Sequence, residues 1–172
     1  MTVLRGRRLY LSGPIEHGDH SGENWRIQPK QILAERYGLE IFDPFCDPKQ
    51  NRVDELNEAC EREDWDTVEA ITADFVSKDL IWVTRSDLLI AYLPYRVPTT
   101  GTVHEIIESN RNKCPTILLC PQGKKYIPKW FRGFIKREHC LGSWEEVYTL
   151  LDAVERGEMK HHRRWRFIYG ML

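Results

Sequence analysis

Three features are missing from this sequence of 172 residues, and each absence excludes a class of protein. No apolar run approaches the about 20 residues that a membrane-spanning helix needs. No apolar core follows the basic residues of Met1–Arg8, so we expect no signal peptide. The 25 basic and 26 acidic residues give a formal net charge of −1, so nothing draws the whole chain to nucleic acid or to an anionic membrane.

Paired cysteines are also missing. The five cysteines are odd in number and have no CxxC spacing: Cys46, Cys60, Cys114, Cys120 and Cys140. We therefore expect reduced structural thiols in a cytoplasmic protein, without a zinc site. What the sequence does have is enough length, and a hydrophobic content of 41%, to bury the core of one globular domain.

The clearest structural signal lies in residues 79–120. Leu88–Leu93 is a short apolar run, which indicates a strand buried on both faces. A proline- and threonine-rich loop follows at 94–101, then a predicted helix at Thr102–Lys113 and a second buried strand at Pro115–Cys120. A strand, helix and strand in this order require a right-handed crossover and a parallel sheet. Because such sheets bind ligands at the carboxyl ends of their strands, the loop is expected to line the site.

The rest of the chain predicts further elements of the same kind. Strands are expected at Arg8–Ser12, Leu39–Phe42 and His139–Leu141, and helices at Gln28–Tyr37, Val68–Thr84 and from the Ser143 cap to about Arg156. Pro29 should lie in the first turn of its helix or kink it. The acidic run at 54–69 is expected to be a solvated helical face.

Two acids stand out by their positions. Glu105 is expected in the first turn of the helix after the loop, where the helix dipole favours a negative charge. A carboxylate there could be a nucleophile or a base, or it could only complement the dipole. Asp79 follows Ile71 and Phe75 at a spacing of four, so it shares an apolar helical face. A buried acid is costly unless it has a partner or a task, and the alternative for Asp79 is a hydrogen bond to a neighbouring loop.

Other residues fall near the expected carboxyl edge of the sheet. Gly13 follows the first strand and would let the backbone approach a ligand, and Asp43 follows the second. Trp25 and Arg26 could cover a base and meet an anion; alternatively, Trp25 packs its helix on the sheet and Arg26 is solvated. We divide the chain into a domain at 1–157 and a basic, aromatic tail at 158–172, which we expect to dock on this subunit or on a neighbour.

Four short strings occur in order along the chain: YLSGPI at 10–15, DL at 79–80, SD at 86–87 and GTVHEI at 101–106. Together they resemble the nucleoside 2-deoxyribosyltransferase superfamily, which includes 2′-deoxynucleoside 5′-phosphate N-hydrolases and pyrimidine nucleotide N-hydrolases. The match runs from about residue 8 to residue 122. The resemblance implies a flavodoxin-like three-layer α/β sandwich, with about five mostly parallel strands and helices on both faces. It also implies a homo-oligomer, such as a homodimer.

The resemblance implies roles for the two acids. Glu105 would attack the anomeric carbon of a nucleoside, and Asp79 would contact or protonate the departing base. The substrate pocket is assigned to Tyr10, Ser12, Gly13, Pro14, Ile15, Trp25, Arg26, Asp43, Thr99, Gly101 and Thr102. Thr99 stands where related nucleotide hydrolases place a phosphate-facing serine, which favours a 5′-phosphorylated substrate. Against this, Glu16 stands where those hydrolases tend to have a basic residue.

The expected function is therefore cleavage, by hydrolysis or base exchange, of the N-glycosidic bond of a nucleoside or nucleoside 5′-monophosphate. Breaking this bond builds positive charge on the sugar, which a carboxylate can stabilise and trap. No metal or other cofactor is expected. The alternatives are a non-catalytic nucleotide-binding or sensing module, an NAD-type glycohydrolase, or a DNA-binding protein that uses its basic tail. The expected partners are the small-molecule substrate and further copies of the chain, with no membrane and no nucleic acid.

Overall fold

A computed structural model describes residues 2–15 and 21–171, and the side chains of all these residues except 21–23. Five strands form one sheet: β1 (Arg8–Ser12), β2 (Glu40–Phe42), β3 (Leu88–Tyr92), β4 (Thr116–Leu119) and β5 (Cys140–Leu141). Their order is β2-β1-β3-β4-β5, and every pairing is parallel. The sequence prediction of a parallel sheet with a crossover between β3 and β4 is confirmed.

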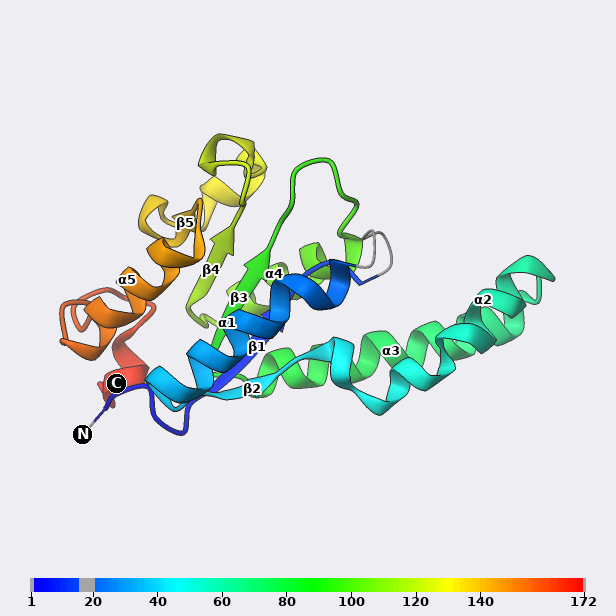
Figure 1. Cartoon of the computed structure of the whole chain (residues 1–172), viewed down its shortest axis with the longest axis horizontal. Coiled ribbons are helices and arrows are strands. Elements are labelled where there is room, and N and C mark those ends of the chain that lie inside the picture. Colours follow the sequence, from blue (N-terminus) through cyan, green and yellow to red (C-terminus); the bar gives the residue numbers. More distant parts are fainter. Residues whose placement is uncertain (1, 16–20, 172) are drawn as a thin grey trace.

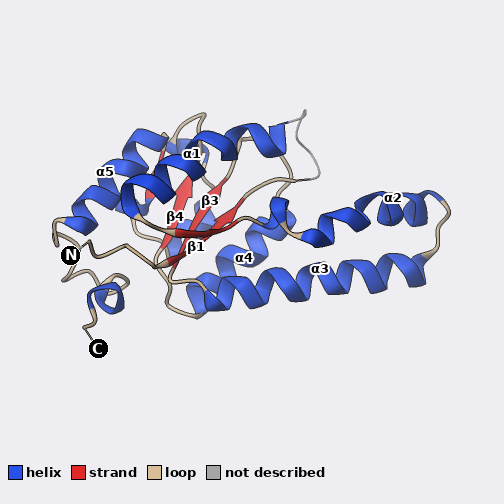
Figure 2. Ribbon diagram, turned by 60° about the horizontal axis from the view of Figure 1, so that its bottom comes forward, coloured by secondary structure: helices blue, strands red, loops and turns tan. Residues whose placement is uncertain are grey.

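In the part of the chain that the structure describes, five α-helices accompany the sheet: α1 (Ser21–Tyr37), α2 (Val53–Glu61), α3 (Trp65–Arg85), α4 (Thr100–Arg111) and α5 (Trp144–Glu155). Helices α1 and α5 lie on one face, and α4 with the second half of α3 lies on the other (Figures 1 and 2). This is the three-layer sandwich that the sequence predicted. As expected, Ser143 caps α5 by accepting a hydrogen bond from the backbone N–H of Glu146 at 3.3 Å.

Side chains of the central strands point alternately to the two faces of the sheet, so both helical layers pack on apolar side chains. Leu9 and Leu11 of β1 pack in the core against α1 and α5, whereas Tyr10 faces the core against α3 and α4. Successive side chains of a strand point to opposite faces, so Ser12 shares the side of Tyr10. The sheet therefore presents two hydroxyl groups, from one end of one strand, to the α3 and α4 layer.

Helices α2 and α3 form an arm that extends beyond the sheet (Figures 1 and 2). The acidic run is divided by a turn near Glu63 and Asp64, and most of its acids are exposed, as predicted. Trp65 at the tip of the arm is 62% exposed, and Val76 is exposed farther along α3. Among the residues that the structure describes, no helix is long and apolar enough to cross a membrane.

Three helix starts differ from the prediction, and that of α3 is Trp65, three residues before the expected Val68. Helix α1 begins at Ser21, seven residues earlier than expected, so Pro29 lies inside it and not in its first turn. Helix α4 begins at Thr100, with Thr99 as its N-cap residue, so Glu105 lies in the second turn. The first turn of α4 contains no acid. The placement of Glu105 in the first turn, at the helix dipole, was therefore wrong, because Thr100 and Gly101 already belong to the helix.

The tail at 158–171 packs into the core that β1 shares with α1 and α5. Trp165 and Ile168 are buried there, together with Leu4 from the start of the chain. Arg7 also donates a hydrogen bond to the backbone carbonyl of Ile168 at 2.9 Å. The tail thus docks on its own subunit, which is one of the two arrangements predicted from the sequence.

Candidate active site

Glu105 lies in the second turn of α4 and is directed at the carboxyl end of β1. Its carboxylate is buried, with the residue only 7% exposed. It accepts a hydrogen bond from the Tyr10 hydroxyl at 2.7 Å and a second from the Ser12 hydroxyl. Both hydroxyls come from alternate positions of one strand, so the sheet itself fixes the direction of the carboxylate.

Asp79 lies on α3 and reaches the same place. Its carboxylate accepts a hydrogen bond from the ammonium group of Lys49, and it is near enough to the Tyr10 hydroxyl to affect the pKa of both groups. Tyr10 thus lies between the two acids, which meet on one side of the sheet. The sequence prediction that residues 79 and 105 share a site agrees with this placement.

Lys49 is the member of this cluster that sequence reasoning missed. Its side chain is only 1% exposed, and its ammonium group also lies 3.4 Å from the carbonyl oxygen of Phe75. Lys49 stands in a short polar segment with two prolines nearby, which has the composition of a surface turn. Nothing in that pattern distinguishes a buried lysine from a solvated one.

The pKa values of both acids are raised. Burial raises the pKa of Glu105, and the charge of Asp79 adds to this, while the donated hydrogen bonds of Ser12 and Tyr10 act in the opposite direction. Burial also raises the pKa of Asp79, against the opposing effect of Lys49. Burial and both carboxylates raise the pKa of Tyr10, so its hydroxyl stays protonated and donates. The cluster is suited to hold a proton on one acid and a negative charge on the other.

The loop after β1 is held by a buried cation. Arg26 is only 1% exposed, and its guanidinium donates to the carbonyls of Gly13 at 3.0 Å and Pro14 at 3.2 Å. It also forms an ion pair with Asp43 at 3.0 Å. The suggestion that Arg26 is solvated was therefore wrong. Asp43 also forms an ion pair with Lys30, whose Nζ lies 2.8 Å from Oδ2 of Asp43. Substrate contacts by Arg26 and Asp43 stay predictions.

Gly13 and Trp25 fit together closely. A Cβ atom on Gly13 would clash with Cζ2 of Trp25, so the close approach here is to the indole ring. The ring stacks on Tyr92 of β3 with centroids 4.3 Å apart. Trp25 therefore packs its helix on the sheet. Its buried indole N–H has no hydrogen-bond partner among the described residues, which leaves a donor beside the Gly13 loop.

The remaining predicted pocket residues lie in two segments: the loop after β1 and the start of α4. Gly101 and Thr102 precede Glu105 by four and three residues, so they share its helical face, and Thr102 is buried. Thr99 is the half-buried N-cap residue of α4, and its side chain makes no capping hydrogen bond. Pro14 is buried and Ile15 is half-buried. Glu16 lies outside the described residues. Substrate contacts by all these residues stay predictions.

Solved structures of other proteins have a similar fold. The 2-deoxyribosyltransferase from Bacillus psychrosaccharolyticus is similar over 84% of this chain and 95% of its own, with a TM-score of 0.57 and 17% identity. The CMP N-glycosidase of Clostridium botulinum is similar over 86% of this chain and 99% of its own, with a TM-score of 0.51 and 18% identity. No family model matches the sequence, and the comparison with curated proteins gives no match. The likeness confirms the predicted fold.

Proposed function

We propose that this protein cleaves the N-glycosidic bond of a nucleoside or nucleoside 5′-monophosphate, with Glu105 as the nucleophile and Asp79 as the acid. The observation that carries the proposal is the buried carboxylate of Glu105, oriented by two hydroxyls and placed beside a second acid. The two solved structures above share the fold and are named for transfer of deoxyribose and for cleavage of CMP. Their chemistry is the same bond cleavage at a sugar anomeric carbon.

The chemistry follows from the charges that develop. As the bond between the anomeric carbon and the base nitrogen breaks, its electron pair leaves with the base, and the proton of Asp79 neutralises it. The Glu105 carboxylate stabilises the positive sugar and forms an ester bond to the anomeric carbon. Water or a second base then displaces Glu105. The proton released in that step returns to Asp79.

The neighbours of the two acids suit these roles. Tyr10 and Ser12 hold the Glu105 carboxylate, so it does not have to reorient when the sugar carbon approaches. Burial raises the pKa of Asp79 and so favours its protonated form, while Lys49 opposes that effect and helps the acid to release the proton. The Thr99 hydroxyl, which caps no backbone N–H, would be available to a 5′-phosphate.

The experiment is a panel of nucleosides, nucleoside 5′-monophosphates and NAD, incubated with and without an acceptor base and analysed by chromatography for free base. We expect release of free base from at least one substrate. Glu105→Gln should lower the rate by about 10³-fold or more, because the amide cannot form the ester. Glu108→Gln is the matched control and should keep full activity. Glu108 lies one turn farther along α4, and its carboxylate accepts a solvent-exposed hydrogen bond from the side chain of Asn112.

The outcomes separate the alternatives. A nucleotide sensor would gain thermal stability with a nucleotide but would release no base. A glycohydrolase for dinucleotides would release nicotinamide from NAD. Unchanged base release by Glu105→Gln would remove Glu105 from the mechanism.

A further inference from the structure

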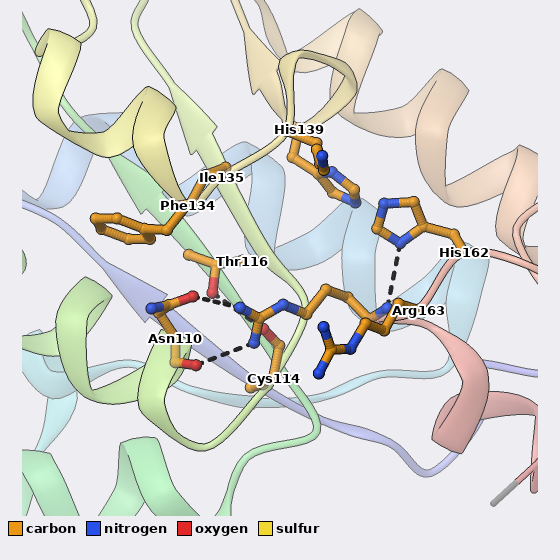
Figure 3. Close-up of a pocket in the computed structure, with 10 residues that line it drawn as sticks. Asn110, Cys114, Thr116, Phe134, Ile135, His139, His162 and Arg163 are labelled. Atoms are coloured by element: carbon orange, nitrogen blue, oxygen red, sulfur yellow. Dashed lines mark hydrogen bonds between the residues drawn. The ribbon is translucent and has the colours of Figure 1, made fainter.

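A second candidate site lies at the opposite end of the sheet. The amino ends of β4 and β5, the end of α4 and the tail enclose a cavity of about 180 Å³ (Figure 3). It is lined by Asn110, Cys114, Thr116, Phe134, Ile135, Lys136, His139, His162, Arg163 and Arg164. The Glu105 carboxylate contacts Tyr10 and Ser12 at the carboxyl end of β1, so this cavity is separate from the proposed active site.

The lining is strongly cationic for a chain whose net charge is −1. Lys136, Arg163 and Arg164 contribute three permanent positive charges, and no lining residue is an acid. Within the described residues, none of the three has a carboxylate partner at salt-bridge distance. Arg163 and Arg164 repel each other, and together with burial this lowers the pKa of Arg164. Positive charges held together without a counter-charge favour an anion.

One of these cations is fixed in place before any ligand binds. Arg164 donates through Nη1 to the backbone carbonyl of Asn110 at 3.0 Å and through Nη2 to the side-chain oxygen of the same residue. These two bonds, drawn in Figure 3, tie the tail to the end of α4. Arg163 lies next to it and is exposed, so its donors are available.

The opposite part of the lining is apolar. Phe134 and Ile135 lie together on one side of the cavity, whereas Cys114 lies near Asn110 and adds an uncharged thiol there (Figure 3). Burial raises the pKa of Cys114 to about 12, so the thiol stays neutral and adds no negative charge. A volume of 180 Å³ is below the about 300–1,000 Å³ of pockets for larger ligands. The cavity therefore suits a small anion that carries a short organic group.

A metal ion is a poorer match for the same residues. Glu138, His139 and His162 have potential ligand atoms within 4.8 Å of one another. However, Nε2 of His139 accepts the indole N–H of Trp165 at 2.8 Å, and Nδ1 of His162 accepts the backbone N–H of Arg164 at 3.3 Å. A neutral imidazole has one lone pair, and both rings have already used it. The surrounding cations would also repel a metal ion.

We propose that this cavity binds a small phosphate-bearing molecule, such as a sugar monophosphate or free phosphate, through Lys136, Arg163 and Arg164. The guanidinium groups would hold the phosphate oxygens, and the Phe134 side would accept the organic group. The site is independent of the proposed N-glycosidase activity, since it shares no residue with the cluster around Glu105.

The imidazole of His162 provides a local probe. Burial, Lys136 and Arg164 lower its pKa, and Glu138, at 3.5 Å from Nε2, opposes them; His139 packs beside it. A bound phosphate would raise the His162 pKa, because it offsets the two cations. NMR titration of the imidazole resonances measures the pKa of His162, which lies at the cavity. Binding of a sugar phosphate at the proposed active site around Glu105 therefore does not interfere with the measurement. A His162→Gln variant assigns the signals.

The test compares inorganic phosphate, ribose 5-phosphate and ribose, each against sodium chloride at equal ionic strength. We expect both phosphates to raise the His162 pKa and ribose and chloride to leave it unchanged. Tighter binding of ribose 5-phosphate than of phosphate would identify the ester as the ligand, and equal binding would identify the free anion. Arg163→Ala should weaken phosphate binding about 10-fold or more, whereas Arg137→Ala, an exposed neighbour outside the lining, should not.

Two results would overturn the proposal. One is a His162 pKa that responds to chloride as it does to phosphate. The other is equal loss of phosphate binding in Arg163→Ala and Arg137→Ala, which would mean attraction to a diffuse positive surface only. Because Arg163 is exposed, its loss is not expected to unfold the protein, and a thermal melt of each variant verifies this.

Discussion

The two ends of the parallel sheet carry side chains of opposite charge, and these side chains differ in their burial and in their hydrogen-bond partners. At the carboxyl end, the buried Glu105 and the half-buried Asp79 lie beside hydroxyl groups and one ammonium group. At the amino end, three cations line a cavity and have no carboxylate partner among the described residues. The first arrangement fixes protons at defined atoms, as bond cleavage requires. The second, by the proposal above, would only attract and hold an anion. Charge alone does not distinguish catalysis from binding; burial and hydrogen-bond partners do.

The comparison is tested most severely by removing an acid at each end. Asp79→Asn should lower the rate of base release by about 10²–10⁴-fold, because the amide cannot donate the proton to the leaving base. Glu138→Gln, which neutralises the acid next to His162 at the amino end, should leave the rate unchanged. Initial rates at saturating substrate measure both. Equal losses in the two variants would contradict a catalytic division between the ends.

A smaller effect is expected from the hydroxyl that orients Glu105. Tyr10→Phe removes a hydrogen bond of 2.7 Å to the carboxylate and should lower kcat by about 10- to 100-fold, since such bonds to charged groups contribute about 1.5–3 kcal/mol. Tyr37→Phe is the matched control, because Tyr37 donates to the Asp152 carboxylate at 2.9 Å on the other side of the sheet. A loss in both variants would point to stability in place of orientation.

The smallest expected effect is a shift in pH dependence. Base release needs Glu105 ionised and Asp79 protonated, so the rate should fall below one apparent pKa and above a second, and both values belong to the coupled pair. Lys49→Met removes the cation that lowers both pKa values, so the whole bell-shaped profile should move to higher pH. Lys30→Met, which removes the ion pair with Asp43, should leave the profile in place. An unmoved profile for Lys49→Met would sink this assignment.

Much of the fold was predictable because it depends on local patterns. The short apolar runs at 88–93 and 115–120 gave two central strands, and the Ser143 cap gave the start of α5. The spacing of Asp79 from Ile71 also indicated the correct helical face. These signals are written in a few neighbouring residues, so no tertiary information was needed to find them.

What could not be predicted depends on contacts between distant segments. Lys49 becomes part of the cluster only because α3 passes over a polar turn, and Trp165 becomes a core residue only because the tail returns to the sheet. The hydroxyls of Thr99 and Thr100 resembled loop composition, which placed the start of α4 too late and Glu105 too close to the helix end. The cationic cavity likewise joins Asn110 to residues of the tail, which no spacing rule connects.

The shared core of the two chain ends has a consequence for synthesis. Leu4 packs in the same cluster as Trp165, and Glu155 accepts backbone hydrogen bonds from Val3 at 2.8 Å and Leu4 at 2.9 Å. A ribosome releases Leu4 long before Trp165, so the face of β1 that packs on α1, α5 and the tail is covered only by α1 while most of the chain is being made. Folding of that side is therefore expected only after translation has passed the tail, and a nascent chain that stalls earlier would need a chaperone to remain free of aggregates.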